Sequence, residues 1–402
     1  MINKSLKLIN IGNLVSYNSK KEAMASKKDL EIVIKNEKII EIGRSLNNAD
    51  EIFDCENKLV TPGFIDCHTH PVFFENRSKE FEMRIKGKSY EEIAQNGGGI
   101  NSSVKTLRES TFDELKQKVH ARMDTFLRLG TTTIEAKSGY GLNLDGELKS
   151  LEVLDSTNSN HEIDIISTFM GAHAIPEEYE NNPDEYIDYL CNVMIPEVSK
   201  QGIAKYNDVF CEDGYFNLEQ TKKILQKGLD YGLLPRIHAD EFKNLGGSSL
   251  AGKMNCISAD HLMNINDQDI SNMVESNVPA VLLPGTTFFL GKSNYAPYLK
   301  IKNSGIDVAI ATDYNPGSSN IQSMVFIIAL ATIYMNMDIY EAIQASTYIP
   351  SKLLNIDSAV GSIEIGKNAD IILWNIKEPI DIPYNFSINP IKSVIKNGKI
   401  LF

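Results

Sequence analysis

The sequence predicts an α/β protein in which a (β/α)₈ TIM barrel, residues 60–355, is joined to a small β-sandwich domain. Segments 1–59 and 356–402 are predicted to form that domain together. Both ends of the chain consist of short β-like runs, whereas the middle alternates apolar runs with helical stretches. A length of 402 residues, 42% of them hydrophobic, suits one large domain and one small domain.

The terminal segments carry alternating apolar and polar residues, which is the pattern of half-buried strands. Such runs lie at 6–11, 31–35 and 38–42 near the start of the chain, and at 370–374 and 394–400 near its end. The last run contains Asn397-Gly398, a strong signal for a hairpin turn. We therefore expect a small antiparallel sheet to which both termini contribute.

The middle of the chain contains eight apolar runs of strand length, separated by helical stretches. The expected strands are 59–66, 131–136, 163–170, 204–210, 234–237, 256–259, 278–283 and 306–311. The expected helices are 112–129, 184–200, 218–231, 266–276, 321–334 and 339–354. Eight strands over roughly 300 residues favour a closed barrel over a doubly wound sheet, which usually has fewer strands and a phosphate-binding glycine turn.

The charge, the cysteine spacing and the lack of long apolar windows limit what kinds of molecule this protein is expected to bind. Lys and Arg total 40 against 53 Asp and Glu, a net charge of -13, which argues against nucleic acid or an anionic membrane as partner. The five cysteines form no CxxC pair, so we expect reduced, mostly buried thiols rather than disulfides or a thiolate zinc site. No apolar leader and no window near the ~18 apolar residues of a membrane span is present, so we expect a soluble cytoplasmic enzyme acting on a small molecule.

Side chains that can ligate metals or transfer protons follow most of the apolar runs. They are His68, His70, Glu135, Lys137, Tyr140, His173, His238, Asp240, Glu241, Asp260, His261 and Asp313. Five of the seven histidines belong to this set. The carboxyl ends of all barrel strands open onto one face, where active sites are built, so these residues are expected to converge. Lys137 is interpreted as an ion-pair partner, with Glu135 as its candidate, rather than as a metal-bridging carbamate.

His68 and His70 are two residues apart on an extended segment, so both imidazoles point to the same side. Such a pair suits zinc or iron(II), and a third histidine with a carboxylate would complete a hydrolytic metal site. An isolated pair is about as compatible with two ordinary histidines as with a metal site. The other residues at the strand ends favour the metal.

These motifs carry a family resemblance. TPGFIDCHTH at 61–70 resembles the first-strand signature of the amidohydrolase superfamily, whose members combine a (β/α)₈ barrel with a small β domain built from both termini. Five further blocks are similar to the imidazolonepropionase family in the same order. They are TTTIEAKSGYGL at 131–142, GAHA at 171–174, HADEF at 238–242, SADHL at 258–262 and ATDYNPGS at 311–318. Any one block alone would indicate only the superfamily.

The resemblance implies hydrolytic ring opening of 4-imidazolone-5-propanoate to N-formimidoyl-L-glutamate, a step in histidine degradation. By position, it implies that His68, His70, His238 and Asp313 hold one Zn²⁺ or Fe³⁺ ion, which would acidify a water molecule and polarise the ring carbonyl. A homodimer is also implied.

The same resemblance assigns catalytic roles. Glu241 is the expected general base, and His261 is expected to stabilise the tetrahedral intermediate or to relay a proton to the leaving nitrogen. Asp313 could share proton transfer while it remains a ligand.

Substrate-binding roles are implied for a further set of residues. These are Arg77, Tyr90, Tyr140, His173, Glu241, Asn315, Gly317 and Ser318. Arg77 would bind the propionate, but Phe74 and Glu75 replace the small residues usual before this arginine, which leaves its pose open. The glycine-rich run 95–100 is a weak match to a phosphate loop, and we interpret it as a loop over the mouth of the site, with a lid role as a hypothesis.

Two alternatives remain open. A related amidohydrolase that acts as a deaminase or iminohydrolase on a nitrogen heterocycle or formimino compound would share the metal site, but it would give Arg77 no evident role. A non-catalytic metal-binding protein on a degenerate barrel would need neither Glu241 nor His261.

Overall fold

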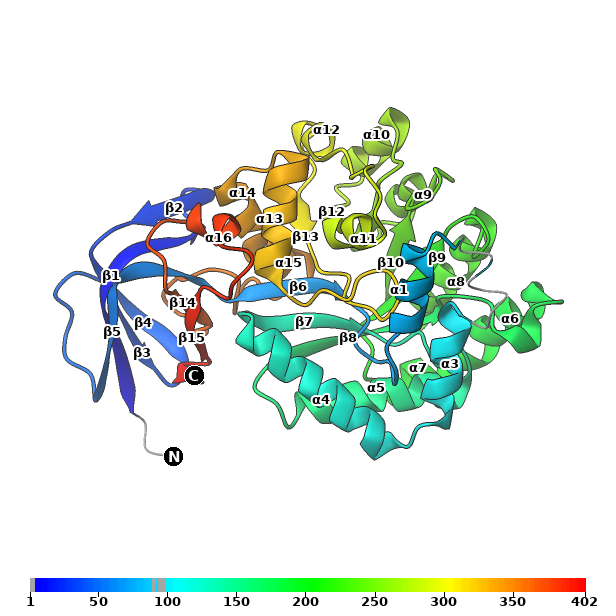
Figure 1. The fold of residues 1–402 in the computed structure, drawn as a ribbon, viewed down its shortest axis with the longest axis horizontal. Helices are drawn as coiled ribbons and strands as arrows, with labels where there is room; N and C mark the ends of the chain where they lie inside the picture. Colours follow the sequence, from blue (N-terminus) through cyan, green and yellow to red (C-terminus); the bar gives the residue numbers. More distant parts are fainter. Residues whose placement is uncertain (1–3, 89–91, 93–97) are drawn as a thin grey trace. The chain divides into compact units, whose positions relative to one another are not determined.

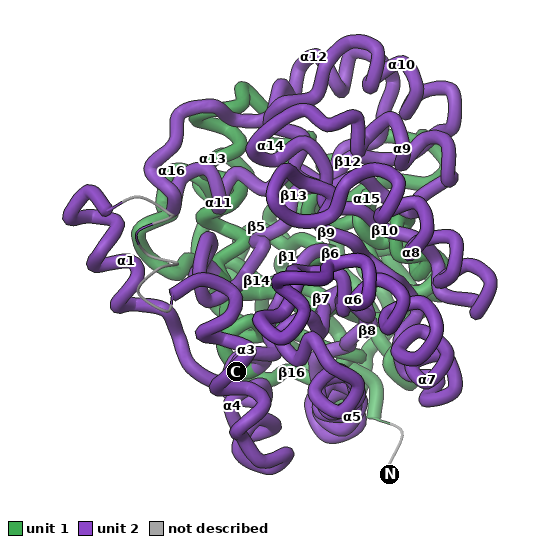
Figure 2. The backbone as a smooth tube through the Cα atoms, turned by 90° about the vertical axis from the view of Figure 1, so that its right-hand side faces the viewer, with its two compact units in different colours: residues 1–67, 124–133, 322–402 green, residues 68–123, 134–321 purple. Residues whose placement is uncertain are grey.

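The computed structural model describes residues 4–88, 92 and 98–402, which form two compact units. Figure 2 shows one unit made of residues 1–67, 124–133 and 322–402, and a second made of residues 68–123 and 134–321. The domain boundaries expected at 59/60 and 355/356 stay a prediction. Tyr90 and residues 95–97 of the glycine-rich run 95–100 lie outside the described residues.

Strands from both ends of the chain share one eight-stranded sheet, as predicted (Figure 1). Its order is β16-β15-β14-β5-β1-β3-β4, and β2 pairs with β1. The strands are β1 (Ser5–Asn18), β2 (Ala23–Lys27), β3 (Leu30–Lys35), β4 (Lys38–Gly43), β5 (Glu51–Pro62), β14 (Ile371–Trp374), β15 (Ile391–Lys396) and β16 (Lys399–Ile400). We expected an antiparallel sheet, but this sheet is mixed, because β1 and β5 pair in parallel. Strands β2 to β4 lie between β1 and β5 in the sequence, so the chain can return in the same direction.

Buried side chains from both termini hold this sheet together. Its core includes Leu8, Ile32 and Ile371, all of them fully buried. The buried Lys396 Nζ lies 2.6 Å from Asp370 Oδ2 in an ion pair between β15 and the start of β14. The predicted Asn-Gly turn joins β15 to β16.

A second eight-stranded sheet contains β6 to β13 in sequence order, which confirms the barrel prediction. Its strands are β6 (Phe64–Thr69), β7 (Thr131–Lys137), β8 (Asp164–Ala172), β9 (Tyr206–Cys211), β10 (Leu234–Ala239), β11 (Ala259–His261), β12 (Ala280–Leu282) and β13 (Val308–Ile310). The pairings from β8 through β13 are parallel. A parallel bridge between Thr69 and Tyr314 joins the first strand to the segment after the last.

Helices connect these strands as in βα units, with α5 against β8, α8 against β9 and α9 against β10 (Figure 1). The helices before β10 are α1 (Ser78–Ile85), α3 (Ile100–Glu109), α4 (Phe112–Arg128), α5 (Leu144–Asn158), α6 (Pro183–Tyr189), α7 (Ile195–Gln201) and α8 (Leu218–Asp230). Those after it are α9 (Gly247–Lys253), α10 (Asp267–Glu275), α11 (Pro284–Phe289), α12 (Tyr298–Asn303), α13 (Met324–Met335), α14 (Ile339–Ala345), α15 (Tyr348–Leu353) and α16 (Asp381–Tyr384). A 3₁₀ turn (Glu177–Tyr179) precedes α6, and capping boxes begin α8, α10 and α14.

The expected strand 59–66 is in fact two strands that belong to different sheets. β5 ends at Pro62 and β6 begins at Phe64. Gly63 separates them, and its N–H donates to the Asp370 carbonyl at 2.9 Å. A Cβ on Gly63 would clash with the Thr132 side chain. An apolar run alone does not show at which residue a chain leaves one sheet for another.

Two expected helices are interrupted. The helix over 184–200 contains a π-helical segment, Leu190–Met194, between α6 and α7. The helix over 339–354 breaks into α14 and α15, where the hydroxyls of Ser346 and Thr347 donate to backbone carbonyls in the preceding turn. The apolar periodicity continues through both interruptions, so it could not reveal them.

All five cysteines are buried, and none of them forms a disulfide in the structure. Within the ranges that the structure covers, no helix combines the length and the apolar character that crossing a membrane requires.

Trp374 gives a test of the terminal sheet. Its side chain is fully buried, its indole N–H donates to Thr61 Oγ1 at 3.0 Å, and its ring meets Phe64 edge-on. We expect Trp374→Ala to lower the free energy of unfolding by about 3–5 kcal/mol, through lost burial and a residual cavity. Urea unfolding followed by far-UV circular dichroism measures this loss. Tyr384→Ala, at a side chain that is 84% exposed, is the control and should change it by less than about 0.5 kcal/mol. Equal effects would contradict the role of Trp374.

Candidate active site and metal centre

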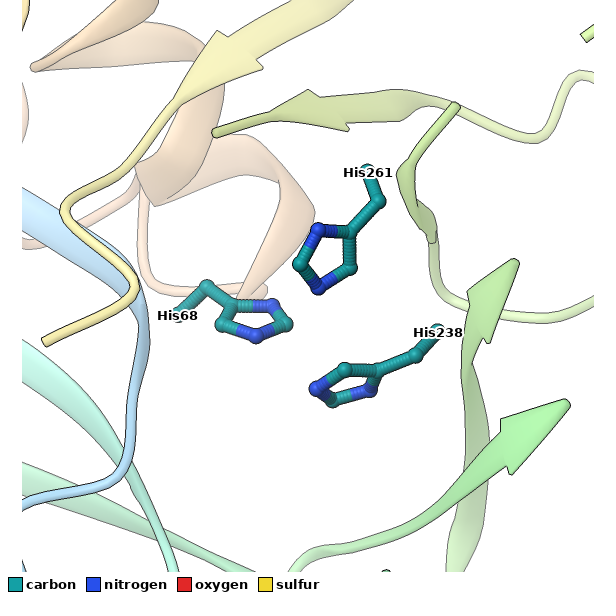
Figure 3. A group of neighbouring side chains, drawn as sticks. All are labelled: His68, His238 and His261. Carbon is teal, nitrogen blue, oxygen red and sulfur yellow. The ribbon is translucent and has the colours of Figure 1, made fainter. Parts of the chain in front are cut away.

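The residues predicted to ligate a metal lie together at the carboxyl ends of the barrel strands. His68 lies near the end of β6 and His70 just beyond it, His238 lies in β10, and Asp313 follows β13. His261 ends β11, and Figure 3 shows the rings of His68, His238 and His261 turned toward one another. All five side chains are buried and belong to the second unit.

Four ligand atoms of this cluster have the spacing of one coordination sphere. His70 Nε2 lies 3.3 Å from both His68 Nε2 and His238 Nε2. Asp313 Oδ1 lies 3.4 Å from His68 Nε2 and 3.3 Å from His70 Nε2. Ligands about 2.0–2.1 Å from a tetrahedral ion lie about 3.3 Å from one another. These four distances match the ligand spacing of a four-coordinate ion. Within this cluster, the groups whose ligand atoms all lie within 4.8 Å of one another are His68, His70 and Asp313, and His68, His238 and His261.

The hydrogen bonds of the distal ring nitrogens also fit a cation. His68 Nδ1 lies 2.6 Å from Asp260 Oδ2, and His238 Nδ1 lies 3.0 Å from Asp208 Oδ1. A carboxylate accepts hydrogen bonds, so both Nδ1 atoms carry the proton and both Nε2 atoms present lone pairs. These lone pairs converge with the Asp313 carboxylate, and a metal cation would satisfy all of these acceptors.

The pKa values of the predicted ligands shift in different directions, and burial lowers the pKa of His238 well below its usual range. Asp260 and Asp313 raise the pKa of His68, although its burial and the charge of Lys137 act in the opposite direction. Burial lowers the pKa of His70, which is therefore neutral and able to ligate. Burial would raise the pKa of Asp313, but hydrogen bonds with His68 and His70 hold it well below its usual range.

Glu241 and His261 lie beside these residues. His261 Nε2 lies 3.6 Å from Glu241 Oε2. Burial, with the negative charge of Asp313, raises the pKa of Glu241 well above its usual range. Burial lowers the pKa of His261 to about 4. Glu241 is thus suited to take up and hold a proton, while His261 is neutral at pH 7.

The backbone is strained where it carries these groups. Asp240, His261 and Asp313 have φ values of 53°, 80° and 51°, in the left-handed region that side chains other than glycine rarely adopt. The Asp240 carboxylate accepts the N–H groups of Leu245 and Ser248 and so anchors the loop that presents Glu241. Asp240 thus supports the site rather than entering it.

A pocket of about 530 Å³ opens above the cluster. Its lining includes every predicted substrate-binding residue that the structure describes, namely Arg77, Tyr140, His173, Glu241, Asn315, Gly317 and Ser318. The role of Tyr90 stays a prediction. A pocket of this size suits a small heterocycle.

Arg77 is held in a defined pose on one side of this pocket. Its Nε and Nη2 atoms lie 2.9 and 2.7 Å from Glu80 Oε2. Glu80 Oε1 accepts the Gly99 N–H at 3.0 Å and the Ser102 hydroxyl at 3.1 Å at the start of α3. Nη1 packs against Gly317 so closely that a Cβ there would clash with the guanidinium. Glu80 and Gly317 therefore restrict the guanidinium from two sides.

The unusual residues before Arg77 are also held in place. Arg122 donates to the carbonyls of Pro71 and Phe73 at 2.8 and 2.6 Å, and its guanidinium lies 3.5 Å from the Phe73 ring centroid. Lys118 Nζ lies 4.6 Å from the Phe74 ring centroid. These contacts define the course of the loop that leads to Arg77.

His173 and Tyr140 form the wall next to the metal ligands. His173 Nδ1–H donates to the Gly139 carbonyl at 2.9 Å, and its ring stacks on His70 at 5.2 Å. Burial lowers the pKa of His173 to about 3, so the ring is neutral, and burial raises the pKa of Tyr140.

Asn315 organises the loop after Asp313. Its Oδ1 accepts the N–H groups of Gly317 and Ser318 at 2.8 and 2.7 Å, and its Nδ2 donates to the Asp313 carbonyl at 2.7 Å. The side chain thus folds its own loop and places Gly317 and Ser318 at the pocket.

The sequence analysis assigned no role to Asp208, Arg236 and Glu80, and it listed Asp260 only as one of the polar residues at the strand ends. Asp208 and Asp260 accept hydrogen bonds from His238 and His68, Arg236 pairs with Asp260, and Glu80 pairs with Arg77. A signal was available, because Asp208 and Arg236 are charged residues inside apolar strand runs, where charge is costly unless it is paired. The expected ion pair between Lys137 and Glu135 is present at 2.8 Å.

Comparison with solved structures shows the fold. A crystal structure of a mutant atrazine chlorohydrolase from Arthrobacter aurescens, complexed with zinc and atraton, matches with a TM-score of 0.77 at 14% identity, over 98% of this chain and 95% of that one. The crystal structure of an adenosine deaminase from Xanthomonas campestris with bound zinc matches with a TM-score of 0.73 at 14% identity, over 98% of this chain and 92% of that one. At this identity the matches concern architecture alone.

Comparison with sequences shows the family. The model of the amidohydrolase family matches residues 236–401. The imidazolonepropionase of Brevibacillus brevis is 46% identical over 89% of this chain and 84% of its own length. The imidazolonepropionase of Alkaliphilus metalliredigens is 40% identical over 92% of this chain and 89% of its own length. The chain therefore belongs to the imidazolonepropionase family of the amidohydrolases.

Proposed function

We propose that this chain hydrolyses 4-imidazolone-5-propanoate to N-formimidoyl-L-glutamate, with one metal ion held by His68, His70, His238 and Asp313. One observation carries the proposal. Three imidazole nitrogens and a carboxylate oxygen converge, with neighbouring atoms 3.3 to 3.4 Å apart, at the floor of a pocket that also contains a guanidinium. A metal hydrolase that acts on a small carboxylated ring needs both features.

The ligand set supports a zinc or iron ion. Neutral imidazoles and a carboxylate suit either metal, and the spacing described above is that of a tetrahedral zinc site. The crystal structures of the atrazine chlorohydrolase and the adenosine deaminase contain zinc, which makes zinc our first choice. When bound, the ion supplies Lewis-acid chemistry, lowering the pKa of water and polarising a carbonyl.

Glu241 is proposed as the general base. Its carboxylate takes a proton as the water oxygen forms a bond to the carbonyl carbon of the ring. Burial and the charge of Asp313 raise its pKa, so the proton remains on Glu241 until it is transferred to the ring nitrogen as the C–N bond breaks. The carbonyl oxygen becomes part of the new carboxylate of the product.

His261 is proposed to stabilise the negative charge that develops on the carbonyl oxygen, or to relay the proton from Glu241. Its Nε2 lies 3.6 Å from Glu241 Oε2, within reach of both roles once substrate is bound. Asp313, a proposed ligand, can share proton transfer through its second oxygen, which accepts a hydrogen bond from Thr286 at 2.5 Å.

Recognition of the propionate is assigned to Arg77. Guanidinium binds carboxylate with a strong charge-assisted hydrogen bond, and Glu80 and Gly317 hold the group in the pocket wall. Tyr140 and His173 lie at the metal side, where they would contact the ring, while Asn315 orders Gly317 and Ser318 beside the propionate. A deaminase acting on a neutral heterocycle would use the metal ligands but would not need Arg77.

The proposal predicts metal-dependent ring opening. Purified protein should remove the ultraviolet absorbance of 4-imidazolone-5-propanoate generated from urocanate, lose this activity after chelation, and regain it when zinc or iron is added. A metal-replete protein that does not accelerate the loss would contradict the substrate assignment. Formimino compounds and nitrogen heterocycles would then be the next substrates to test.

Glu241→Gln should lower kcat by at least about 100-fold, because the amide cannot accept the proton. Metal content, measured by elemental analysis, should stay at the wild-type level, since Glu241 is not a ligand. Glu219→Gln, at an exposed position on α8, is the control and should leave kcat unchanged. Near-normal turnover in Glu241→Gln would exclude it as the base.

Arg77→Ala should raise KM about tenfold or more and change kcat less, because a charge-assisted hydrogen bond to the propionate is lost. Gly317→Ala should act in the same direction, since its methyl group would displace the guanidinium. Lys86→Ala, an exposed change at the C-cap of α1, is the control. An unchanged KM in Arg77→Ala would mean that the propionate binds elsewhere.

A further inference from the structure

We infer that Arg236 and Lys137 are positioning residues of the metal centre, each of which holds one ligand histidine through a buried carboxylate and so sets the affinity for the ion. This inference rests on the proposed metal centre. Neither residue is among the ligands, and neither lines the pocket. Both side chains are fully buried, so no solvent replaces the contacts that they make.

The first chain of contacts runs from Arg236 to His68. Arg236 Nη2 lies 2.9 Å from Asp260 Oδ2, and the same oxygen accepts from His68 Nδ1 at 2.6 Å. All three side chains are completely buried. The guanidinium therefore holds the oxygen that orients the His68 ring, whose Nε2 faces the proposed ion.

The second chain runs from Lys137 to His238. Lys137 Nζ lies 2.8 Å from Asp208 Oδ2, while Asp208 Oδ1 lies 3.0 Å from His238 Nδ1. One carboxylate thus binds the ammonium with one oxygen and the ligand histidine with the other. A carboxylate held at both oxygens cannot rotate without breaking one of these contacts.

Glu135 joins the two chains of contacts. Its Oε1 lies 2.8 Å from Lys137 Nζ and 3.7 Å from Arg236 Nη1, and it also accepts a hydrogen bond from Thr168. Two cations are therefore held by three buried carboxylates, those of Glu135, Asp208 and Asp260. In this low-dielectric interior each contact is strong, and removal of one cation leaves a carboxylate without its ionic partner.

The strand register produces this layer. Arg236 and His238 lie two residues apart on β10, so their side chains point to the same side of the strand. Across the parallel neighbours, Arg236 is in register with Asp208 on β9, and His238 is in register with Asp260 on β11. Arg236 and Asp208 therefore lie one layer below His238, whereas Asp260 lies at its level, and all of these side chains are buried.

The test is the affinity for zinc, measured on metal-free protein by competition with a chromophoric chelator. Arg236→Met and Lys137→Met keep a long side chain but remove the charge, and each should weaken zinc binding about 10- to 100-fold, as expected when an outer-shell partner of a ligand is lost. Arg236→Lys, which keeps the charge but not the planar fork, should lose less affinity than Arg236→Met.

Lys396→Met is the matched control. Lys396 is equally buried and pairs with Asp370 at 2.6 Å, but it lies in the terminal sheet. This change should lower stability and leave zinc affinity at the wild-type value. Far-UV circular dichroism establishes folding. If Arg236→Met does not fold, Asp260→Ala tests the same chain of contacts by removing the carboxylate that accepts from His68, with the same 10- to 100-fold loss expected.

The outcomes separate this inference from the proposed function. Zinc affinities within threefold of wild type in the folded Lys137 and Arg236 variants would overturn the inference and leave the substrate assignment intact. Wild-type protein that binds zinc but does not open 4-imidazolone-5-propanoate would contradict the proposed function. In that case, weakened zinc binding in the variants would still support the positioning role.

Discussion

Closure of the barrel between its first and last strands is the constraint on which the rest of the site depends. The Asp313 N–H donates to the His68 carbonyl at 3.0 Å, and the His70 N–H donates to the Tyr314 carbonyl at 2.8 Å. These main-chain bonds place residues from opposite ends of the barrel sequence side by side, so that the Asp313 carboxylate meets both histidines. Ligands carried on flexible loops could not keep this spacing, because each would have to be ordered at a cost in conformational entropy.

The interior beneath the ligands is ionic rather than apolar. Buried charge is costly, and it is tolerated here because each carboxylate lies against a cation, a histidine or both. The arrangement defines the tautomer and direction of His68 and His238, which an apolar filling could not do.

In the proposed function, chemistry and substrate choice are located on different parts of the pocket. The strand ends carry the proposed ligands and acid–base residues, in a fold similar to those of the atrazine chlorohydrolase and the adenosine deaminase. The guanidinium of Arg77 comes from the segment after β6, where Glu80 ties it to the start of α3 and Gly317 leaves room for it. A barrel of this kind can therefore change substrate without changing its metal centre, because the loops vary independently of the strands.

The barrel, the shared terminal sheet and the group of residues at the strand ends could be predicted from the chain alone, because apolar periodicity and polar strand ends are local patterns. The pairing of His68 and His70 could be predicted too, since their spacing on an extended segment is also local. Three features appeared only in the folded chain: the contacts of Asp208, Asp260 and Arg236 around His68 and His238, the pairing of Glu80 with Arg77, and the division of the run around Gly63 between two sheets. Each of these depends on which strands are neighbours and in what register they pair, and a hydrogen bond between residues distant in sequence leaves no periodic signal in the chain.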